Sequence, residues 1–281
     1  MQFLDNIFFA LLLAIGIGYF AINVKKLIRN IKLGHDVDRS DNASERWKNM
    51  TMVALGQSKM VKRPVAGFLH IIVYVGFVII NIEVIEIIID GLFGTHRVLS
   101  FMGGFYDVLI GSFEILAFLV LITVIIFWIR RNVTKLGRFA SSDLDGKPRN
   151  DANYILYFEV VLMSLFLLMN AADFHLQNLG IGHYNQAGSF PISQFIAPMF
   201  NGMSEGLVVI IERAAWWLHI AGILVFLNYL YFSKHLHILL AFPNTYFADL
   251  NAKGKLNNLE SVTNEVKLMM DPNADPFAAP A

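Results

Sequence analysis

The chain has 281 residues, of which 56% are hydrophobic and only 16% are charged, and its formal net charge is zero. Soluble globular domains carry about 25% charged residues, so the composition indicates a membrane protein, and the zero net charge argues against nucleic-acid binding. The absence of cysteine excludes disulfides, covalently attached haem, thiolate-ligated haem and cysteine-bound iron–sulfur clusters in this chain.

Five apolar stretches are long enough to cross a bilayer as helices. They are predicted at residues 5–24, 66–90, 106–129, 154–174 and 214–241. The first lacks the basic start and the small-residue cleavage site of a signal peptide. The predicted fold is therefore an all-α bundle of five transmembrane helices. The bundle occupies residues 1–243, and residues 244–281 form a cytoplasmic tail or linker with a short helix near 258–270.

Lysine and arginine are unequally distributed among the connections between these helices. Segment 25–63 holds ten and segment 130–152 holds six, whereas 91–105 holds only Arg97 and 175–212 holds none. By the positive-inside rule, the first two segments and the C-terminus are cytoplasmic and the N-terminus is outside. The sequence thus predicts a multi-pass protein surrounded by lipid in the bacterial inner (cytoplasmic) membrane.

The fifth predicted span carries two histidines eighteen residues apart, His219 and His237. In one continuous helix, eighteen residues make five turns, so both rings would point from the same face, about 27 Å apart. This separation is close to the thickness of the hydrocarbon core, roughly 30 Å. The pattern therefore predicts one candidate haem ligand near each membrane surface. His235 would lie about 200° around the helix from His237 and could not share the same iron, so it is expected to be an interfacial or propionate-contacting residue.

The second predicted span carries His70, one or two turns inside its cytoplasmic end and at the depth expected for His237. A polar ring inside an apolar helix is costly and usually functional. We therefore expect His70 and His237 to be the axial ligands of one non-covalent haem. The structural alternative is that each histidine forms a hydrogen bond to a neighbouring helix or reaches the interface.

A partner for His219 is expected near the outer surface. The candidates are His175 at the outer end of the fourth span, His96 in the loop after the second span, and His183 in the next loop. His175 and His96 are favoured equally as the second ligand of a second haem. Otherwise His219 would form a hydrogen bond with a carboxylate or a quinone.

Acidic residues occur within the predicted spans. Glu83 and Glu86 share one face of the outer half of the second helix, and Glu114 lies in the outer half of the third. Buried acids in lipid commonly mark proton or substrate paths. We expect these three residues to serve proton exchange with a quinone. The alternative is that some face water or pair with Arg97 or Arg213.

The sequence WWLHIAGILVFLNYLYFSKHLHILLAFPNTYF resembles the last helix of the respiratory nitrate reductase gamma subunit, a five-helix dihaem cytochrome b, and GFLHIIVYVGFVI resembles its second helix. The broader resemblance includes the membrane cytochrome b subunits of heterodisulfide-reductase-type complexes. It also includes the membrane part of bacterial iron–sulfur oxidoreductases, in which five helices precede a cysteine-rich, ferredoxin-like domain. The resemblance covers roughly residues 1–245 and depends on His70, His219 and His237 together with the five-span layout.

This resemblance implies that His70 and His237 hold the haem nearer the cytoplasmic partner, and that His219 is one ligand of the haem nearer the outside. The family's fourth ligand, ten residues after the first in the second helix, falls on Ile80 in this sequence. The resemblance therefore implies one haem b with both ligands present. It leaves a second haem without an assigned partner for His219.

The predicted function is that of a membrane-embedded b-type cytochrome, the redox subunit of a quinone-linked oxidoreductase. It would transfer electrons between menaquinone or ubiquinone and a cytoplasmic iron–sulfur protein, or an iron–sulfur domain that follows the linker. The alternative function is that of a non-haem transporter or a structural anchor subunit of a larger complex. A transporter more often shows repeats or broken helices, and an anchor does not require histidines in lipid.

Overall fold

The computed structural model describes residues 2–134, 136–139, 141–252, 254 and 258–272. Within these residues the chain is helical and contains no strand. Five helices are long and apolar enough to cross a membrane. They are α1 (Gln2–Ile31), α3 (Pro64–Phe93), α4 (Gly104–Asn132), α5 (Lys147–Asn178) and α7 (Glu205–Leu230). The predicted all-α fold with five long apolar helices is confirmed, and the chain is a multi-pass membrane protein.

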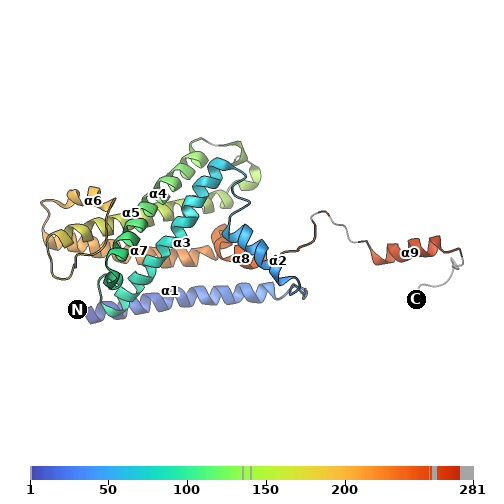
Figure 1. Cartoon of the computed structure of the whole chain (residues 1–281), viewed down its shortest axis with the longest axis horizontal. Coiled ribbons are helices and arrows are strands. Elements are labelled where there is room, and N and C mark those ends of the chain that lie inside the picture. The colour runs from blue at the N-terminus through green and yellow to red at the C-terminus, as the bar shows by residue number, and fades with distance from the viewer. Residues whose placement is uncertain (1, 135, 140, 253, 255–257, 273–281) are drawn as a thin grey trace.

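Shorter helices connect and follow the five long ones. They are α2 (Ala43–Met50), η1 (Thr51–Leu55), η2 (Val98–Met102), η3 (Gly137–Phe139), η4 (Ser142–Leu144), α6 (Ser193–Ile196), η5 (Ala197–Phe200), η6 (Lys234–Leu236), α8 (His237–Tyr246) and α9 (Glu260–Met270). In Figure 1, α9 lies apart from the other helices. It confirms the short helix expected near 258–270. The Pro/Ala-rich end of the expected linker, 273–281, is outside the described residues.

The long helices pack in the cyclic order α1, α3, α4, α5 and α7, and α7 packs again on α1 (Figure 1). Large apolar side chains such as Phe113, Phe166 and Ile220 fill the interior of this ring. Others, such as Phe68 and Leu218, are exposed on its outside. Helices that are apolar on all sides are suited to lipid because one face meets other helices and the other meets acyl chains.

The bundle has two ends that differ in charge. We call one the N-terminal end, because it carries the chain's N-terminus together with the connections 94–103 and 179–204. The other is called the basic end, because its connections 32–63 and 133–146 carry nine lysines and arginines, whereas those of the N-terminal end carry only Arg97; residues 231–250 also lie there.

The fifth predicted span is not a single helix. α7 begins at Glu205, nine residues earlier than predicted, and ends at Leu230, and α8 begins only at His237. His219 and His237 therefore belong to different helices, and the expectation that they project from one face of one helix is wrong. Because α7 starts early, His219 lies near its middle, about 21 Å from its first residue. His219 is expected near one end of the fifth span, and it lies near the middle of α7 instead.

Side chains compensate for the broken helix at residues 231–236. Ser233 is extended, and its hydroxyl oxygen accepts a hydrogen bond from the backbone N–H of His235 at 3.0 Å. Asp151 of α5 accepts hydrogen bonds from the Tyr229 hydroxyl at 2.7 Å and from the backbone N–H of Lys234 at 3.3 Å. The acceptors of the two backbone N–H groups replace helical carbonyl groups, so these donors stay satisfied where the helix is interrupted.

A buried arginine attaches α8 to α2 at the basic end. The Arg46 guanidinium donates hydrogen bonds to the backbone carbonyl oxygens of Tyr246 at 3.2 Å and Ala248 at 3.0 Å. The ring of Trp47 packs edge-on against the Tyr246 ring, with centroids 5.4 Å apart. The boundary expected between residues 243 and 244 thus falls inside a helix that is packed against the bundle.

Candidate functional site

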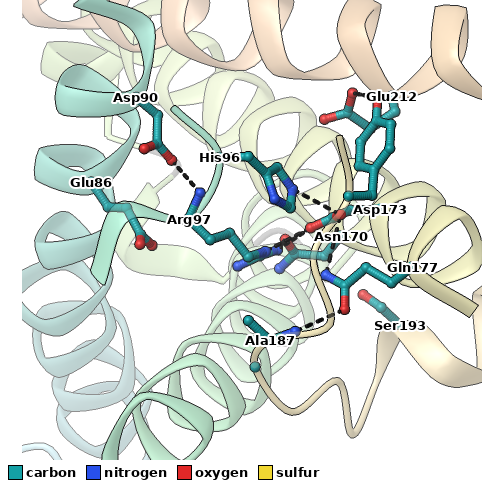
Figure 2. Close-up of polar contacts among 12 residues, drawn as sticks. Glu86, Asp90, His96, Arg97, Asn170, Asp173, Gln177, Ala187, Ser193 and Glu212 are labelled. Carbon is teal, nitrogen blue, oxygen red and sulfur yellow. Dashed lines mark hydrogen bonds and ion pairs between the residues drawn. The ribbon is translucent and has the colours of Figure 1, made fainter. Parts of the chain in front are cut away.

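A network of charged and polar side chains lies at the N-terminal end of the bundle (Figure 2). Arg97, from the loop after α3, forms a 2.6 Å ion pair with Asp173 of α5. It also donates hydrogen bonds to Asn170 at 2.9 Å and to the Tyr106 hydroxyl at 3.3 Å. Burial alone would lower the pKa of Arg97, but the Asp173 carboxylate outweighs burial and raises the pKa above its usual value. Arg97 is therefore a fixed buried cation.

Acidic residues of α3 hold the loop that carries Arg97. Asp90 accepts a hydrogen bond from the Arg97 backbone N–H at 2.7 Å. Glu86 accepts hydrogen bonds from the Leu99 backbone N–H at 2.9 Å and from the Tyr106 hydroxyl at 2.8 Å. Arg97 has a φ of 51°, a left-handed conformation that is costly for a residue with a side chain. The two carboxylates supply the hydrogen bonds that maintain it.

His96 lies beside the same carboxylate. Its Nε2 is 3.1 Å from Asp173 Oδ1, and its ring centroid is 5.5 Å from that of His183 and 5.3 Å from that of Tyr184. A carboxylate paired with Arg97 only accepts hydrogen bonds, so Nε2 carries the hydrogen in this arrangement. The lone pair is then on Nδ1, which is buried and has no hydrogen-bond partner among the described residues.

The network encloses a cavity of about 120 Å³ between α1, α3, α5 and α7. Glu83 lines this cavity, is 3% exposed, and has a buried Oε2 without a described hydrogen-bond partner. The other lining residues include Asp5, Phe9, Glu86, Asp90, His96, Arg97, Asp173, His183, Glu212, Arg213, Trp216 and Trp217. A cavity of this volume with unpartnered polar atoms accommodates ordered water or a ligand.

The arginines at this end pair with acids other than the expected ones. Arg97 pairs with Asp173, and Arg213 pairs with Glu212, whose carboxylate also accepts a hydrogen bond from the Tyr184 hydroxyl at 2.9 Å. Burial, followed by the negative charge of Glu212, raises the pKa of Tyr184, so this phenol stays a donor. In the described part of the chain, the only ion pairs recorded for these two arginines involve neither Glu83, Glu86 nor Glu114.

Glu114 lies away from the cavity. Its Oε2 accepts hydrogen bonds from the backbone N–H groups of Ile192 at 3.0 Å and Ser193 at 3.1 Å. It therefore holds the connection 179–204 against α4. The structure thus brings Glu83 and Glu86 together at one cavity and places Glu114 elsewhere.

His219 lines a second cavity, of about 80 Å³, in the middle of the bundle. Its Nδ1 lies 3.0 Å from the backbone carbonyl oxygen of Leu162, and its ring packs against Phe166 at 5.7 Å between centroids. Because a carbonyl oxygen only accepts, Nδ1 donates and Nε2 bears the lone pair. The residue is only 2% exposed and its recorded contacts are a carbonyl oxygen and an aromatic ring, so the neutral form of the ring fits this position.

Ile80 lines the cavity that contains His219, together with Asn81 and Glu159. The position at which the resembling family carries its fourth ligand therefore faces the same space as His219. Since isoleucine has no donor atom, the polar groups available in this cavity are those of Asn81, Glu159 and His219.

The two favoured histidine partners do not reach His219. His96 contacts Asp173 and His219 contacts Leu162, and these two α5 residues are separated by eleven positions, about 16 Å along the helix. His175 lies two positions beyond Asp173, farther still from Leu162. The structure therefore brings neither histidine close enough to share an iron with His219.

Three histidines gather at the basic end. His70 of α3 is half-buried, and its Nδ1 is buried without a described partner. The rings of His235 and His237 lie 5.2 Å apart, so the expected separation of about 200° around a helix is wrong because the helix is broken there. Burial, followed by the positive charges of His237 and His70, lowers the pKa of His235 to about 4. The three rings are thus within electrostatic reach of one another.

Several site residues were not singled out from the sequence. Asn170, Asp173 and Gln177 follow i, i+3, i+7 spacing in the fourth span and form one buried polar face of α5. That spacing was visible in the sequence and could have predicted a polar contact inside the bundle. Glu212 gave a weaker signal, because it sits beside Arg213 at the edge of an apolar run.

The chain is similar to two curated bacterial oxidoreductases. It is 31% identical over 263 residues to the probable iron-sulfur-binding oxidoreductase FadF of Bacillus subtilis (strain 168), a match that covers 94% of this chain and 35% of the relative. It is 25% identical over 232 residues to the EtfAB:quinone oxidoreductase of Syntrophomonas wolfei subsp. wolfei, with 80% of this chain and 31% of the relative covered.

The chain spans about a third of the length of the curated relatives it matches. No protein-family model matches it, and no solved structure matches it. The predicted similarity to iron–sulfur oxidoreductases is confirmed, because one of the two relatives is described as iron–sulfur-binding.

Among the described residues, no group of three or more His, Asp or Glu side chains is arranged to hold a metal ion.

Proposed function

We propose that this chain is the membrane-spanning electron-transfer module of an iron–sulfur oxidoreductase that reacts with quinone. One relative is described as iron–sulfur-binding and the other as a quinone oxidoreductase, and both are about three times as long as the matched region. Iron–sulfur clusters are generally held by cysteine thiolates, and this chain has no cysteine. The clusters would therefore belong to a partner protein or to a further domain.

The proposed orientation places the basic end in the cytoplasm of a bacterium, where the iron–sulfur partner would dock. This assignment follows the positive-inside rule. Most lysines and arginines of the connections lie at that end, and the connections of the N-terminal end carry only Arg97.

The observation that carries the proposal is that His70 and His237 lie within electrostatic reach of each other at the basic end, on helices far apart in the sequence. His237 lies 5.2 Å from His235 between ring centroids, and His70 is within electrostatic reach of His235, which supports a common location for the three rings. His237 Nδ1 is 3.2 Å from the Lys234 carbonyl oxygen, so Nδ1 donates and Nε2 keeps its lone pair. A histidine whose second nitrogen is fixed by a backbone carbonyl is the usual form of a metal-ligating histidine.

These residues fit a b-type haem held by His70 and His237. A haem bound there supplies one-electron redox chemistry. The chain supplies two neutral imidazole ligands, and His235 with its low pKa adds no positive charge at neutral pH. Charge and burial around axial ligands are among the factors that set a haem potential.

The cavity that contains His219 is the candidate site for the quinone head group. Its lining is apolar apart from Asn81, Glu159 and His219. Ligand sites typically combine an apolar lining with a small number of converging polar groups. His219 is suited to accept a hydrogen bond at Nε2 from a quinol hydroxyl, since its Nδ1 is already engaged by Leu162.

The test is the reduced-minus-oxidised visible spectrum of the purified full-length protein, with haem measured per chain. We expect a b-type spectrum that disappears in His70→Ala and in His237→Ala. His35→Ala, which changes an exposed loop histidine, is the matched control and retains the spectrum. Circular dichroism of each variant verifies that the helices are intact. Absence of a b-type signal in the unaltered protein overturns the haem assignment.

A further inference from the structure

The polar cavity at the N-terminal end lies behind a wall of residues that it shares with the surface. A surface hollow lies next to it and is lined by exposed residues, among them Phe101, Gly182 and Asn185. Five residues line both the hollow and the buried cavity: Gly94, Thr95, His96, Arg97 and His183. The titratable side chains in this shared wall are His96, His183 and Arg97, and Arg97 is held as a cation by Asp173.

The two histidines differ in exposure in the order that a proton route requires. His183 is exposed to solvent, whereas the side chain of His96 is 8% exposed. Their ring centroids are 5.5 Å apart, which permits proton transfer directly or through one water. His96 Nε2 is anchored on Asp173, so its unpartnered Nδ1 is the nitrogen free to take up or release a proton.

Two of the acids around the histidines are paired with arginines. Asp173 pairs with Arg97, and Glu212 pairs with Arg213. Asp5 of α1 and Glu83, Glu86 and Asp90 of α3 complete the titratable lining of the cavity. Burial, followed by the positive charge of His96, lowers the pKa of His183. The two rings thus resist being charged together, which suits the passage of one proton at a time.

Glu83 is the inward end of this arrangement. It is buried in the cavity and its Oε2 has no described partner. On the same helix, Ile80 is one turn away and Val84 is the next residue, and both line the cavity of His219. Glu83 therefore lines the polar cavity and is adjacent along α3 to residues that line the candidate quinone site. The polar cavity has room for several ordered waters between His96 and Glu83.

We propose that His183, His96 and Glu83 form a proton route from the aqueous phase at the N-terminal end to the interior of the bundle. This inference rests on the proposed quinone chemistry. Reduction of a quinone consumes two electrons, delivered by the iron–sulfur partner, and two protons, delivered by this route, and yields the quinol. Oxidation of a quinol runs the same route in reverse and releases both protons at the N-terminal end.

The experiment is infrared spectroscopy of the full-length protein in lipid nanodiscs, with the buffer changed from H₂O to D₂O. The carboxyl C=O band that is missing in Glu83→Gln reports the protonated Glu83. Deuterium exchange of this band is expected to slow by about tenfold or more in His96→Gln and in His183→Gln. Glutamine retains polarity and approximate volume at these positions but does not carry protons. Added imidazole should restore exchange in His183→Ala, because that site is exposed.

Asp107→Asn is the matched control, because Asp107 is an exposed acid at the same end that lines neither hollow. Its exchange rate should equal that of the unaltered protein. Absence of a Glu83 carboxyl band, or unchanged exchange in both glutamine variants, overturns the route. The result is independent of the haem spectrum. A b-type signal with unaffected exchange rejects the route alone, and slowed exchange without a b-type signal rejects the haem assignment alone.

Discussion

Arg97 and Asp173 form a buried ion pair at 2.6 Å that joins the loop after α3 to α5. Each also forms a hydrogen bond with another member of the network: Arg97 donates to Asn170, and Asp173 accepts from His96. The pair is therefore a junction between the ring of helices and the loop that closes its N-terminal end.

Substitution Asp173→Asn should destabilise the protein strongly. It leaves the Arg97 cation buried without a counter-charge, and removing one partner of a buried pair typically costs about 3–5 kcal/mol of the free energy of unfolding. The midpoint of thermal unfolding in detergent should fall accordingly. Asp107→Asn, at an exposed position, should leave the midpoint nearly unchanged. Equal midpoints for the two variants would contradict a structural role for the ion pair.

Substitution Ile80→His should raise the haem content. Ile80 and His219 line the same cavity, so a histidine at position 80 adds the ligand that the resembling cytochromes carry there. We expect one haem per chain before the change and two after it, measured by pyridine haemochrome assay. Ile82→His, on the exposed face of α3, should add none. Two haems in the unaltered protein would show that His219 already has a second ligand.

Substitution Gly91→Ala should loosen α1. A Cβ at Gly91 would lie 2.5 Å from the Phe9 ring, and Phe9 is held between Trp216 and Trp217 at 5.2 and 5.8 Å. Overpacking of this kind costs about 1–3 kcal/mol. Gly18→Ala is the control on α1 itself, because a Cβ there meets no atom within 4 Å.

The Gly18→Ala control should match or exceed the unaltered protein in unfolding midpoint, since alanine favours a helix over glycine by about 1 kcal/mol. Opposite shifts of the two variants are the expected signature. A stabilised Gly91→Ala variant would mean that α1 does not pack on α3 as described.

Substitution Arg46→Lys should free the start of the tail. The planar guanidinium reaches the carbonyl oxygens of Tyr246 and Ala248 together, and a lysine ammonium does not reproduce this fork. Loss of one charge-assisted hydrogen bond of about 1.5 kcal/mol corresponds to roughly a tenfold faster local opening. Limited proteolysis after residue 248 measures it. Lys48→Arg, an exposed change on the same helix, should leave the cleavage rate unaltered.

The five long helices could be predicted because length and hydropathy are local properties of the sequence. Each predicted span lies within or overlaps an observed helix, and most of the observed helices extend by several residues at one or both ends. Pro64 begins α3 and Gly94, with a φ of 70°, ends it, as residues with these backbone preferences do.

The break after Leu230 could not be predicted in the same way. Residues 231–236 (YFSKHL) contain neither proline nor glycine, the usual helix-breaking residues, and the hydrogen bonds that compensate for the turn come partly from Asp151 of α5. Similarly, the partner of Arg97 depends on how the loop after α3 meets α5. Contacts between distant segments decide both features, and a pattern along one segment does not contain them.

The two ends of the bundle also determine how the reaction would respond to voltage. In the proposed orientation, electrons enter from the cytoplasm near His70 and His237, and protons enter from the opposite face through His183 and His96. Negative charge moving outward and positive charge moving inward add as electric current, so each electron paired with a proton transfers one elementary charge across the membrane. Each such charge changes the free energy of the reaction by about 2.3 kcal/mol for every 100 mV.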